Sequence, residues 1–358
     1  MTGGTDDDVL LRTEGRAAHL TLNRPRALNA LTHSMVRTIA RALDAWEDDP
    51  SVGTIVISGA GERGLCAGGD IRAIHDSARA GTAEAADFWR DEYRLNARIA
   101  RLTTPYVAVM DGIVMGGGVG VSAHGSVRIV TERSRVAMPE TGIGFVPDVG
   151  GTHLLARAPG LTGTHLALTG APVGAADARL AGLADHFVPS GDLPALLAAL
   201  AELPAHEAVA RYERPAPPGE LAAHREWIDH CYAAGTVEEI VRRLLDHGSP
   251  AAKEAATALQ AKSPTALKVT LASLRRAGRA ETLESVLEQE YRVSCHMLAH
   301  PDLAEGVRAQ VIDKDRAPRW SPATLGEVTD EDVNRMFAPL GDARELRLAP
   351  TDPQEVPR

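Results

Sequence analysis

Residues 106–120 read Y-V-A-V-M-D-G-I-V-M-G-G-G-V-G, a short apolar run followed by a cluster of glycines. The run 106–110 is apolar throughout, which predicts a buried strand. Glycine lets other atoms approach the main chain closely, so we expect the loop after the strand to expose backbone amides to a ligand. Such amides can hold a phosphate or the oxyanion that develops during acyl transfer.

Short apolar runs and helical stretches alternate around this segment. Strands are predicted at 9–14, 17–22, 54–58 and 127–130, with a hairpin between the first two. Apolar residues recur at three- and four-residue spacing in 28–46, and a plausible buried face runs through 84–101, so both are predicted as helices. The alternation indicates an α/β fold with largely parallel strands. Residues 191–212 and 221–300 contain helix formers without strand runs, which predicts a helical second half.

The composition excludes several functional classes. The chain has 38 Lys and Arg against 48 Asp and Glu, and the net charge of −10 argues against general nucleic-acid binding. Its three cysteines form no C-x-x-C pair, so we expect neither a disulfide framework nor a cysteine metal site. No apolar stretch approaches the ~18 residues of a membrane span, and residues 1–8 do not resemble a signal peptide. We therefore expect a soluble, cytoplasmic protein that binds no metal.

The glycine loops allow two other interpretations. Residues 118–123 fit the dinucleotide pattern G-x-G-x-x-A. However, residues 111–117 separate them from their strand, and too few residues follow for a crossover helix, so a Rossmann site is disfavoured. Cys66, in the Gly-rich segment 59–70, is either a nucleophile or, more simply, a small residue that packs under a tight loop.

Five motifs in order resemble the crotonase (enoyl-CoA hydratase/isomerase) superfamily. They are Asn23-Arg24-Pro25 with Asn29-Ala30-Leu31, Cys66-Ala67-Gly68-Gly69-Asp70-Ile71, Asp111-Gly112 with Gly116-Gly117-Gly118, Pro139-Glu140, and Gly144-Phe145-Val146-Pro147 with Gly150-Gly151. The resemblance implies a crotonase-like spiral of repeated ββα units with a C-terminal helical region, and an acyl-CoA substrate. We accordingly expect a spiral core at 9–205, a helical region at 220–325, and a partly flexible extension at 326–358.

The resemblance also assigns roles to residues of these motifs. It implies an oxyanion hole made by the backbone amides of Cys66 and Gly117, with Gly116 binding substrate beside it. Arg24 and Arg26 fall on loops near the expected CoA phosphates. Asp70 is expected to cap the helix that starts at the next residue.

The departures from the hydratase pattern are informative. Hydratases of the family carry two glutamates. This chain has Gly120 at the position of the first and retains the second as Glu140. A second acid appears instead at Asp148. This pair, together with residues 66–72, 91–96 and 313–322, resembles the 3-hydroxyisobutyryl-CoA hydrolase branch. That branch implies that Glu92 lines the substrate pocket.

The implied reaction is hydrolysis of the thioester of 3-hydroxyisobutyryl-CoA, or of a similar short 3-hydroxyacyl-CoA, in valine catabolism. Glu140 would activate water or attack the thioester directly, and Asp148 would orient the water or act as the partner acid. Two neighbouring carboxyls should titrate together, with one pKa raised. CoA enters as part of the substrate, so no separate cofactor is expected, nor any nucleic-acid or membrane partner, while a homo-oligomer stays open.

Three alternatives stay open at this point. The chain could be a hydratase or isomerase of the same superfamily, with Asp148 replacing the missing glutamate. It could bind acyl-CoA without turning it over, although a pure binder has no need of paired acids. Finally, Glu140 and Asp148 could simply cap helices, as many acidic residues do beside turns.

Overall fold

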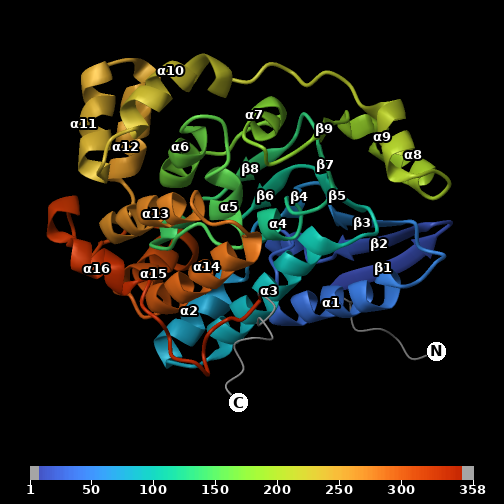
Figure 1. The fold of residues 1–358 in the computed structure, drawn as a ribbon, viewed down its shortest axis with the longest axis horizontal. Helices are drawn as coiled ribbons and strands as arrows, with labels where there is room; N and C mark the ends of the chain where they lie inside the picture. Colours follow the sequence, from blue (N-terminus) through green and yellow to red (C-terminus); the bar gives the residue numbers. More distant parts are fainter. Residues whose placement is uncertain (1–7, 349–358) are drawn as a thin grey trace.

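The computed structural model describes residues 8–348, and its centre is a six-stranded sheet (Figure 1). The order along the sheet is β1 (Val9–Glu14), β2 (Ala17–Leu22), β3 (Thr54–Gly59), β5 (Tyr106–Met110), β7 (Val127–Val130) and β9 (His186–Phe187). The first two strands form an antiparallel hairpin, and every later neighbour pairs in parallel. The predicted α/β class with largely parallel pairing is confirmed.

A second, smaller sheet explains the winding of the chain. It contains β4 (Gly64–Cys66), β6 (Ile113–Met115) and β8 (Arg135–Ala137), all parallel. Each of its strands directly follows a strand of the large sheet, so every turn of the chain adds one strand to both sheets. This is the predicted spiral of ββα units. The loops after β4, β6 and β8 meet at one edge, because the carboxyl ends of parallel strands lie together.

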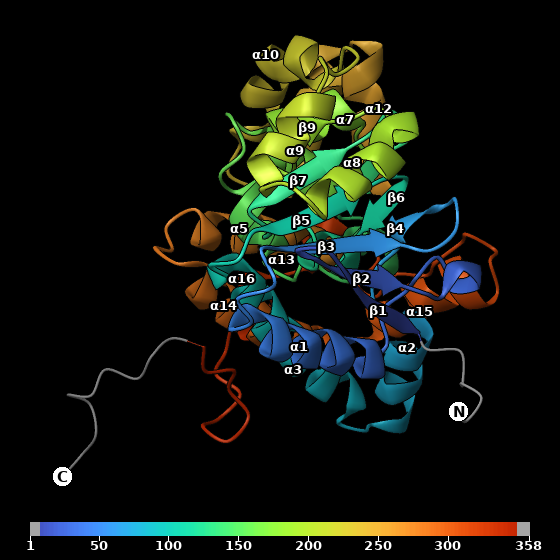
Figure 2. The same ribbon diagram turned by 90° about the vertical axis from the view of Figure 1, so that its right-hand side faces the viewer.

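Short and long helices complete the turns of the spiral. They are α1 (His33–Glu47), α2 (Ile71–Ala80), α3 (Glu84–Arg101), α4 (Gly117–Gly120), α5 (Gly151–Leu155), α6 (Thr162–Thr169) and α7 (Ala175–Leu180). One face of the large sheet, with Val56 and Val107, packs against α8 (Leu193–Leu200) and α9 (Ala205–Tyr212). The opposite face, with Ile55 and Ile57, belongs to the main core (Figure 2). This alternation follows from the two-residue period of a strand.

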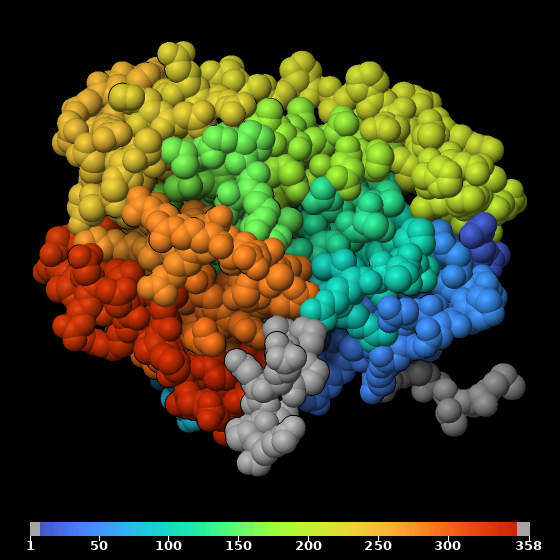
Figure 3. Space-filling view, viewed as in Figure 1, coloured from blue at the N-terminus to red at the C-terminus, as the bar shows by residue number. Residues whose placement is uncertain are grey.

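The remaining helices fold back onto the spiral. They are α10 (Leu221–Tyr232), α11 (Val237–His247), α12 (Pro250–Gln260), α13 (Pro264–Ala277), α14 (Leu283–Leu298), α15 (Pro301–Val307) and α16 (Asp330–Arg335). Helix α14 packs along α3, and α13 contacts α5 and α6. In the space-filling view these helices form one continuous surface with the spiral (Figure 3). One cluster of buried apolar residues extends from Val9 to Leu346, so both parts of the described chain share a core.

The last described residues contact the rest of the chain. Leu340 and Leu346 are buried, and Arg90 on α3 donates hydrogen bonds to the carbonyls of Arg344 and Glu345. The rest of the expected extension, 349–358, lies outside the described residues. The boundaries at 205 and 220 stay predictions. Among residues 8–348, no helix combines the length and apolar character that a membrane crossing requires.

Candidate active site

The loops after β4, β6 and β8 enclose a cavity of about 310 Å³. The backbone of Gly68, Gly69, Gly116 and Gly117 forms one wall. The other walls come from α3, from the short 3₁₀ helix Glu140–Ile143, and from side chains of the C-terminal helical region. The cavity therefore lies where the glycine loops were predicted to expose their amides.

Three acidic side chains line this cavity and come from three different elements. Glu92 lies on α3, Glu140 begins the 3₁₀ helix, and Asp148 belongs to the turn before α5. Their residues are only 2%, 6% and 5% exposed. Since charged groups are rarely buried without partners, three carboxyls at one cavity indicate a site built for chemistry.

Two glycines make room for two of these carboxyls. A Cβ on Gly116 would lie 2.9 Å from Glu140 Oε1, and one on Gly117 would lie 2.6 Å from Glu92 Oε1. Gly116 also has a φ of +49°, which disfavours other residues. Any side chain here would displace the carboxylates, so the glycine triplet and the acids form one unit.

Glu140 and Glu92 carry oxygen atoms that the protein leaves unpaired. Glu140 Oε2 and Glu92 Oε1 are buried without a hydrogen-bond partner among residues 8–348. Burial, and then the negative charge of Asp148, raise the pKa of both side chains well above the usual value for glutamate. Unpaired acceptors on side chains that line a cavity are suited to a substrate hydroxyl or to a water molecule.

Asp148, unlike the unpaired oxygens of the two glutamates, has a hydrogen-bond partner in the described chain. Its Oδ2 accepts a hydrogen bond of 2.7 Å from the hydroxyl of Tyr93, which lies 2.8 Å from the hydroxyl of Ser294. Burial raises the pKa of Asp148 to about 7, and the hydrogen bond from Tyr93 opposes this shift. A carboxyl with such a pKa can exchange a proton near neutral pH.

Two backbone amides lie close together in the glycine wall of the cavity. Gly117 is the first residue of α4, so no residue of its own helix can accept its N–H. Leu31 bonds to the carbonyl of Gly68 and to the amide of Asp70, so the Gly69 amide between them points the opposite way. The Gly69 nitrogen lies 3.2 Å from the position of a Cβ on Gly117.

The structure places Cys66 outside this cavity. Its residue is fully buried in β4, paired with Val114, and the loop brings Gly69 to the cavity instead. Burial raises the pKa of the Cys66 thiol to about 12, so a thiolate nucleophile is disfavoured. Its sulfur contacts the backbone of Gly68, 3.4 Å away, which agrees with the packing role considered above.

The two predicted CoA-binding arginines do not line the cavity in the described chain. The Arg24 guanidinium bonds to the carbonyl of Ala30 at 2.6 Å and to Asp70 at 3.1 Å. Asp70 occupies the cap position of α2 but makes no capping bond there, because its carboxylate pairs with Arg24. The backbone carbonyl of Arg26 accepts from Arg63 at 2.9 Å. These contacts brace the loop before α1.

The cation that lines the cavity is Lys262, which the sequence patterns did not single out. It lies between α12 and α13, and burial lowers its pKa. A single lysine between two helices has no distinguishing spacing, so only the fold reveals it. Trp89 and Phe145, stacked with ring centroids 5.2 Å apart, form an apolar wall that was also not predicted.

Position 120, where hydratases of the family carry a glutamate, has no room for a side chain, and we call it closed. A Cβ on Gly120 would lie 2.7 Å from Val149 Cβ and 2.9 Å from Asn96 Nδ2. A side chain therefore cannot enter from this position without moving the backbone next to Asp148. The packing at position 120 thus differs from that of the hydratases, and Asp148 is the other acid besides Glu92 and Glu140 among the residues that line the cavity.

A spiral of ββα units around paired amides and carboxyls defines an enzyme class that stabilises an acyl oxyanion. A family model described as enoyl-CoA hydratase/isomerase matches residues 17–337, and the chain belongs to this family. Among curated proteins it is similar to mitochondrial 3-hydroxyisobutyryl-CoA hydrolases. The protein of Gallus gallus is 46% identical over 352 residues, covering 95% of this chain and 91% of that one. The Homo sapiens protein is 44% identical over 356 residues, covering 96% and 92%.

Two solved structures are similar over nearly their whole length. One is titled a carnitinyl-CoA dehydratase from Mycobacterium thermoresistibile, with 54% identity, a TM-score of 0.92, and coverage of 95% of this chain and 98% of that one. The other is titled an enoyl-CoA hydratase from Rhodobacter sphaeroides, with 47% identity, a TM-score of 0.90, and coverage of 96% and 100%. The curated relatives are described as mitochondrial, so they do not support the expected cytoplasmic location.

Proposed function

We propose that this protein hydrolyses the thioester of 3-hydroxyisobutyryl-CoA to the free hydroxy acid and CoA, as a step of valine catabolism. The observation that carries the proposal is the buried pair Glu140 and Asp148 beside a closed position 120. The similarity to 3-hydroxyisobutyryl-CoA hydrolases over about 95% of the chain supports the same substrate. The reaction needs water and the CoA ester, and we assign no other cofactor.

The amides of Gly69 and Gly117 are our candidates for the oxyanion hole, with Gly69 taking the place expected for Cys66. Amide donors on a rigid loop stabilise the negative charge that appears on the carbonyl oxygen as the tetrahedral centre forms. One such donor contributes roughly 10²–10³ in rate. Gly116 allows the carboxyl of Glu140 to approach this point.

Glu140 is our candidate for the reacting carboxylate. Its unpaired Oε2 can take a proton from attacking water, or it can attack the thioester carbon and form an anhydride that water then opens. Asp148, with a pKa of about 7, can hand a proton to the departing CoA sulfur. Glu92 can bond the hydroxyl of the acyl group through its unpaired Oε1.

A hydratase or isomerase activity is the second candidate, because the two similar solved structures carry dehydratase and hydratase titles. Hydration in this family uses two glutamates, and Gly120 removes one of them. Val149 and Asn96 fill the space next to Gly120, so a larger side chain at position 120 would have no room to extend into the cavity. These features favour hydrolysis over hydration.

The deciding experiment measures release of free thiol from 3-hydroxyisobutyryl-CoA with a thiol-reactive dye. Wild type should release CoA, and Glu140→Ala and Asp148→Asn should each reduce kcat by at least about 10². The same preparations are tested for hydration and isomerisation of short enoyl-CoA esters. Wild-type hydration without thiol release would establish the second candidate, and tight binding without either reaction would indicate a non-catalytic acyl-CoA binder.

A further inference from the structure

Helix α14 carries two buried polar side chains, one bonded to the turn after Asp148 and one bonded to Tyr93, the partner of Asp148. Glu290 and Ser294 are one helical turn apart, so they lie on the same face of α14. Their residues are 1% and 0% exposed. Neither belongs to the spiral, and neither lines the cavity. Buried polar groups of this kind need a specific reason to be there.

Glu290 holds the backbone that follows Asp148. Its Oε2 accepts from the Gly150 amide at 2.6 Å, and its Oε1 accepts from the Thr152 amide at 3.0 Å and hydroxyl at 2.5 Å. All three partners are donors, so both oxygens of the carboxyl act as acceptors. One side chain from α14 thus spans the turn from residue 150 to residue 152.

This turn has an unfavourable backbone that needs such support. Val149 has a φ of +53° and Gly150 a φ of +78°. A β-branched residue in the left-handed region costs about 1–2 kcal/mol, which the surrounding structure must offset. His124 supports the turn from the opposite side, with its Nε2 2.7 Å from the Val149 carbonyl. Burial lowers the pKa of His124 to about 4, so the neutral ring donates this bond.

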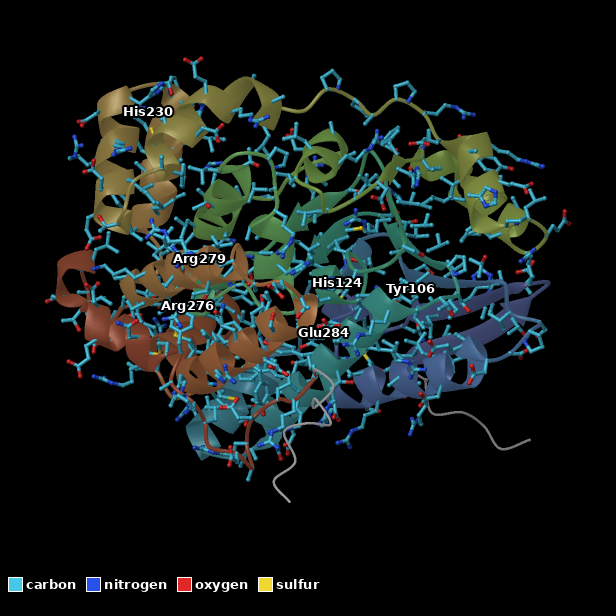
Figure 4. The ribbon with its side chains drawn as sticks, viewed as in Figure 1. Tyr106, His124, His230, Arg276, Arg279 and Glu284 are labelled. Carbon is cyan, nitrogen blue, oxygen red and sulfur yellow. The ribbon has the colours of Figure 1, made fainter. Side chains whose placement is uncertain are left out.

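Figure 4 labels His124 and also Glu284, which lies in the first turn of α14. A Cβ on Gly150 would lie 2.5 Å from His124 Nε2 and 2.9 Å from Leu283 of α14. The turn is therefore clamped between the spiral and the C-terminal helix, with no room for a side chain at position 150.

Ser294 acts on the Asp148 carboxyl through Tyr93. Tyr93 uses its single hydroxyl proton in the bond to Asp148 Oδ2. The hydroxyl of Ser294 lies 2.8 Å from the Tyr93 hydroxyl oxygen, so Ser294 is the donor in this second bond. The chain of bonds from Ser294 through Tyr93 fixes the direction in which Asp148 points. Glu290 fixes the position of the backbone of the turn, and Ser294, through Tyr93, fixes the orientation of the Asp148 side chain.

We propose that Glu290 and Ser294 are positioning residues for Asp148, so that α14 belongs to the catalytic apparatus of the spiral. The proposal rests on the proposed function, in which Asp148 is the partner acid of Glu140. Because a misplacement of about 1 Å can cost roughly 10²-fold in rate, losing either contact should reduce kcat more than it weakens substrate binding. Substrate contacts belong to other residues, so KM should change little.

The carboxyl of Glu290 also contributes charge. Its negative charge raises the pKa of Glu140, and burial raises the pKa of Glu290 itself to about 8. The titratable groups around it are Glu140 and Asp148 from the spiral, Tyr93 from α3 and His124 from the segment after α4. Glu290→Gln replaces a group that ionises near pH 8 with one that does not ionise, so the variant should lose any limb of the pH–rate profile that belongs to this group, whereas Ser294→Ala removes no titratable group.

The experiment compares Glu290→Gln, Thr152→Val and Ser294→Ala with matched controls. Glu288→Gln makes the same change elsewhere on α14, Ser285→Ala removes an exposed hydroxyl from that helix, and Thr152→Ser keeps the hydroxyl that Thr152→Val loses. We expect kcat for thiol release to fall roughly 10–100-fold in the three test variants, with KM within about three-fold of wild type. Thr152→Ser should restore the activity that Thr152→Val loses.

A crystal structure of Glu290→Gln supplies a readout that does not depend on turnover. The amide NH₂ of glutamine cannot accept the bonds that the carboxylate accepts, so the turn should move and the 2.7 Å contact between Tyr93 and Asp148 should lengthen. An unmoved turn would overturn the positioning proposal, as would kcat within about two-fold of wild type in Thr152→Val and Ser294→Ala. A wild type that releases no thiol would instead overturn the proposed function, and the crystal structure would still decide the role of Glu290.

Discussion

The hydroxyl of Tyr93 on α3 and the carboxylate of Asp148, before α5, are joined by a hydrogen bond of 2.7 Å. It is a bond to the ionised form of Asp148, and it therefore works against the burial that raises the pKa of this carboxyl to about 7. The relationship sets both the direction and the proton affinity of the partner acid. It can be tested by removing a single oxygen atom.

Tyr93→Phe should raise the pKa of Asp148 further, because the variant loses the donor that stabilises the carboxylate. We expect kcat for thiol release to fall about 10-fold, and the limb of the pH–rate profile that belongs to the pair to move to higher pH. The control is Tyr212→Phe on α9, which is remote from the cavity. A pH–rate profile that coincides with that of wild type would contradict this role of Tyr93.

Asp148→Asn should change how stability depends on pH. In the folded chain Asp148 keeps its proton up to about pH 7, whereas the unfolded chain loses it near 3.8, so this group's contribution to folding falls as pH rises between the two. The variant has no such group, so its free energy of unfolding relative to wild type should rise by more than about 1 kcal/mol between pH 5 and pH 7.5. Urea unfolding at the two pH values measures the difference.

Asp185→Asn is the control with the opposite sign. Bonds and charge from Arg128 lower the pKa of Asp185, so its contribution to stability is present above the unfolded pKa and is lost as pH falls. Its substitution should therefore cost more at pH 7.5 than at low pH. Parallel curves for wild type and Asp148→Asn would show that Asp148 does not keep its proton in the folded chain.

Gly120→Ala should destabilise the fold and impair the site. Its Cβ would press against Val149 and Asn96, and overpacking of this kind costs about 1–3 kcal/mol. Gly120→Glu should gain no enoyl-CoA hydration, since the space for the side chain is filled. Gly235→Ala is the matched control, because nothing lies within 4 Å of the added Cβ. Thermal unfolding and both activity assays check the prediction, and hydration by Gly120→Glu would refute it.

Cys66→Ala should keep thiol release within about three-fold of wild type. The thiol is fully buried and its pKa is raised to about 12, so we expect a small loss of stability from packing alone. Iodoacetamide should not inactivate wild type through this residue. A loss comparable to that of Glu140→Ala would restore the nucleophile interpretation.

The longer elements could be predicted from the sequence because their patterns repeat. The hairpin of β1 and β2, the helix Glu84–Arg101, and the strands Tyr106–Met110 and Val127–Val130 have the predicted bounds. The strands of the small sheet were not predicted, because each has three residues and cannot show a period. Their pairing depends on neighbours in the spiral, which is a property of the whole fold.

The candidate site was only partly predictable for similar reasons. Glu92, Glu140, Asp148, Gly116 and Gly117 lie at the cavity, as the motifs implied. The shift from Cys66 to Gly69 follows from the direction of successive amides in an extended segment, which a motif does not report. Arg24 was assigned by its charge and by its place on a loop of the resembled family, and the structure pairs it with Asp70. Glu290 has no motif around it, since its partners are backbone amides that any sequence could supply.

The clamp between Glu290 and the turn after Asp148 joins residues 140 positions apart in the chain. A ribosome delivers the spiral first and α14 much later, so the glycine loops emerge before the helix that fastens them. During that interval the nascent chain carries the acids of the site without their support. The order of synthesis therefore delays the competent enzyme until the chain is nearly complete, and a chain shortened before α14 should bury its sheet yet leave Asp148 unfastened.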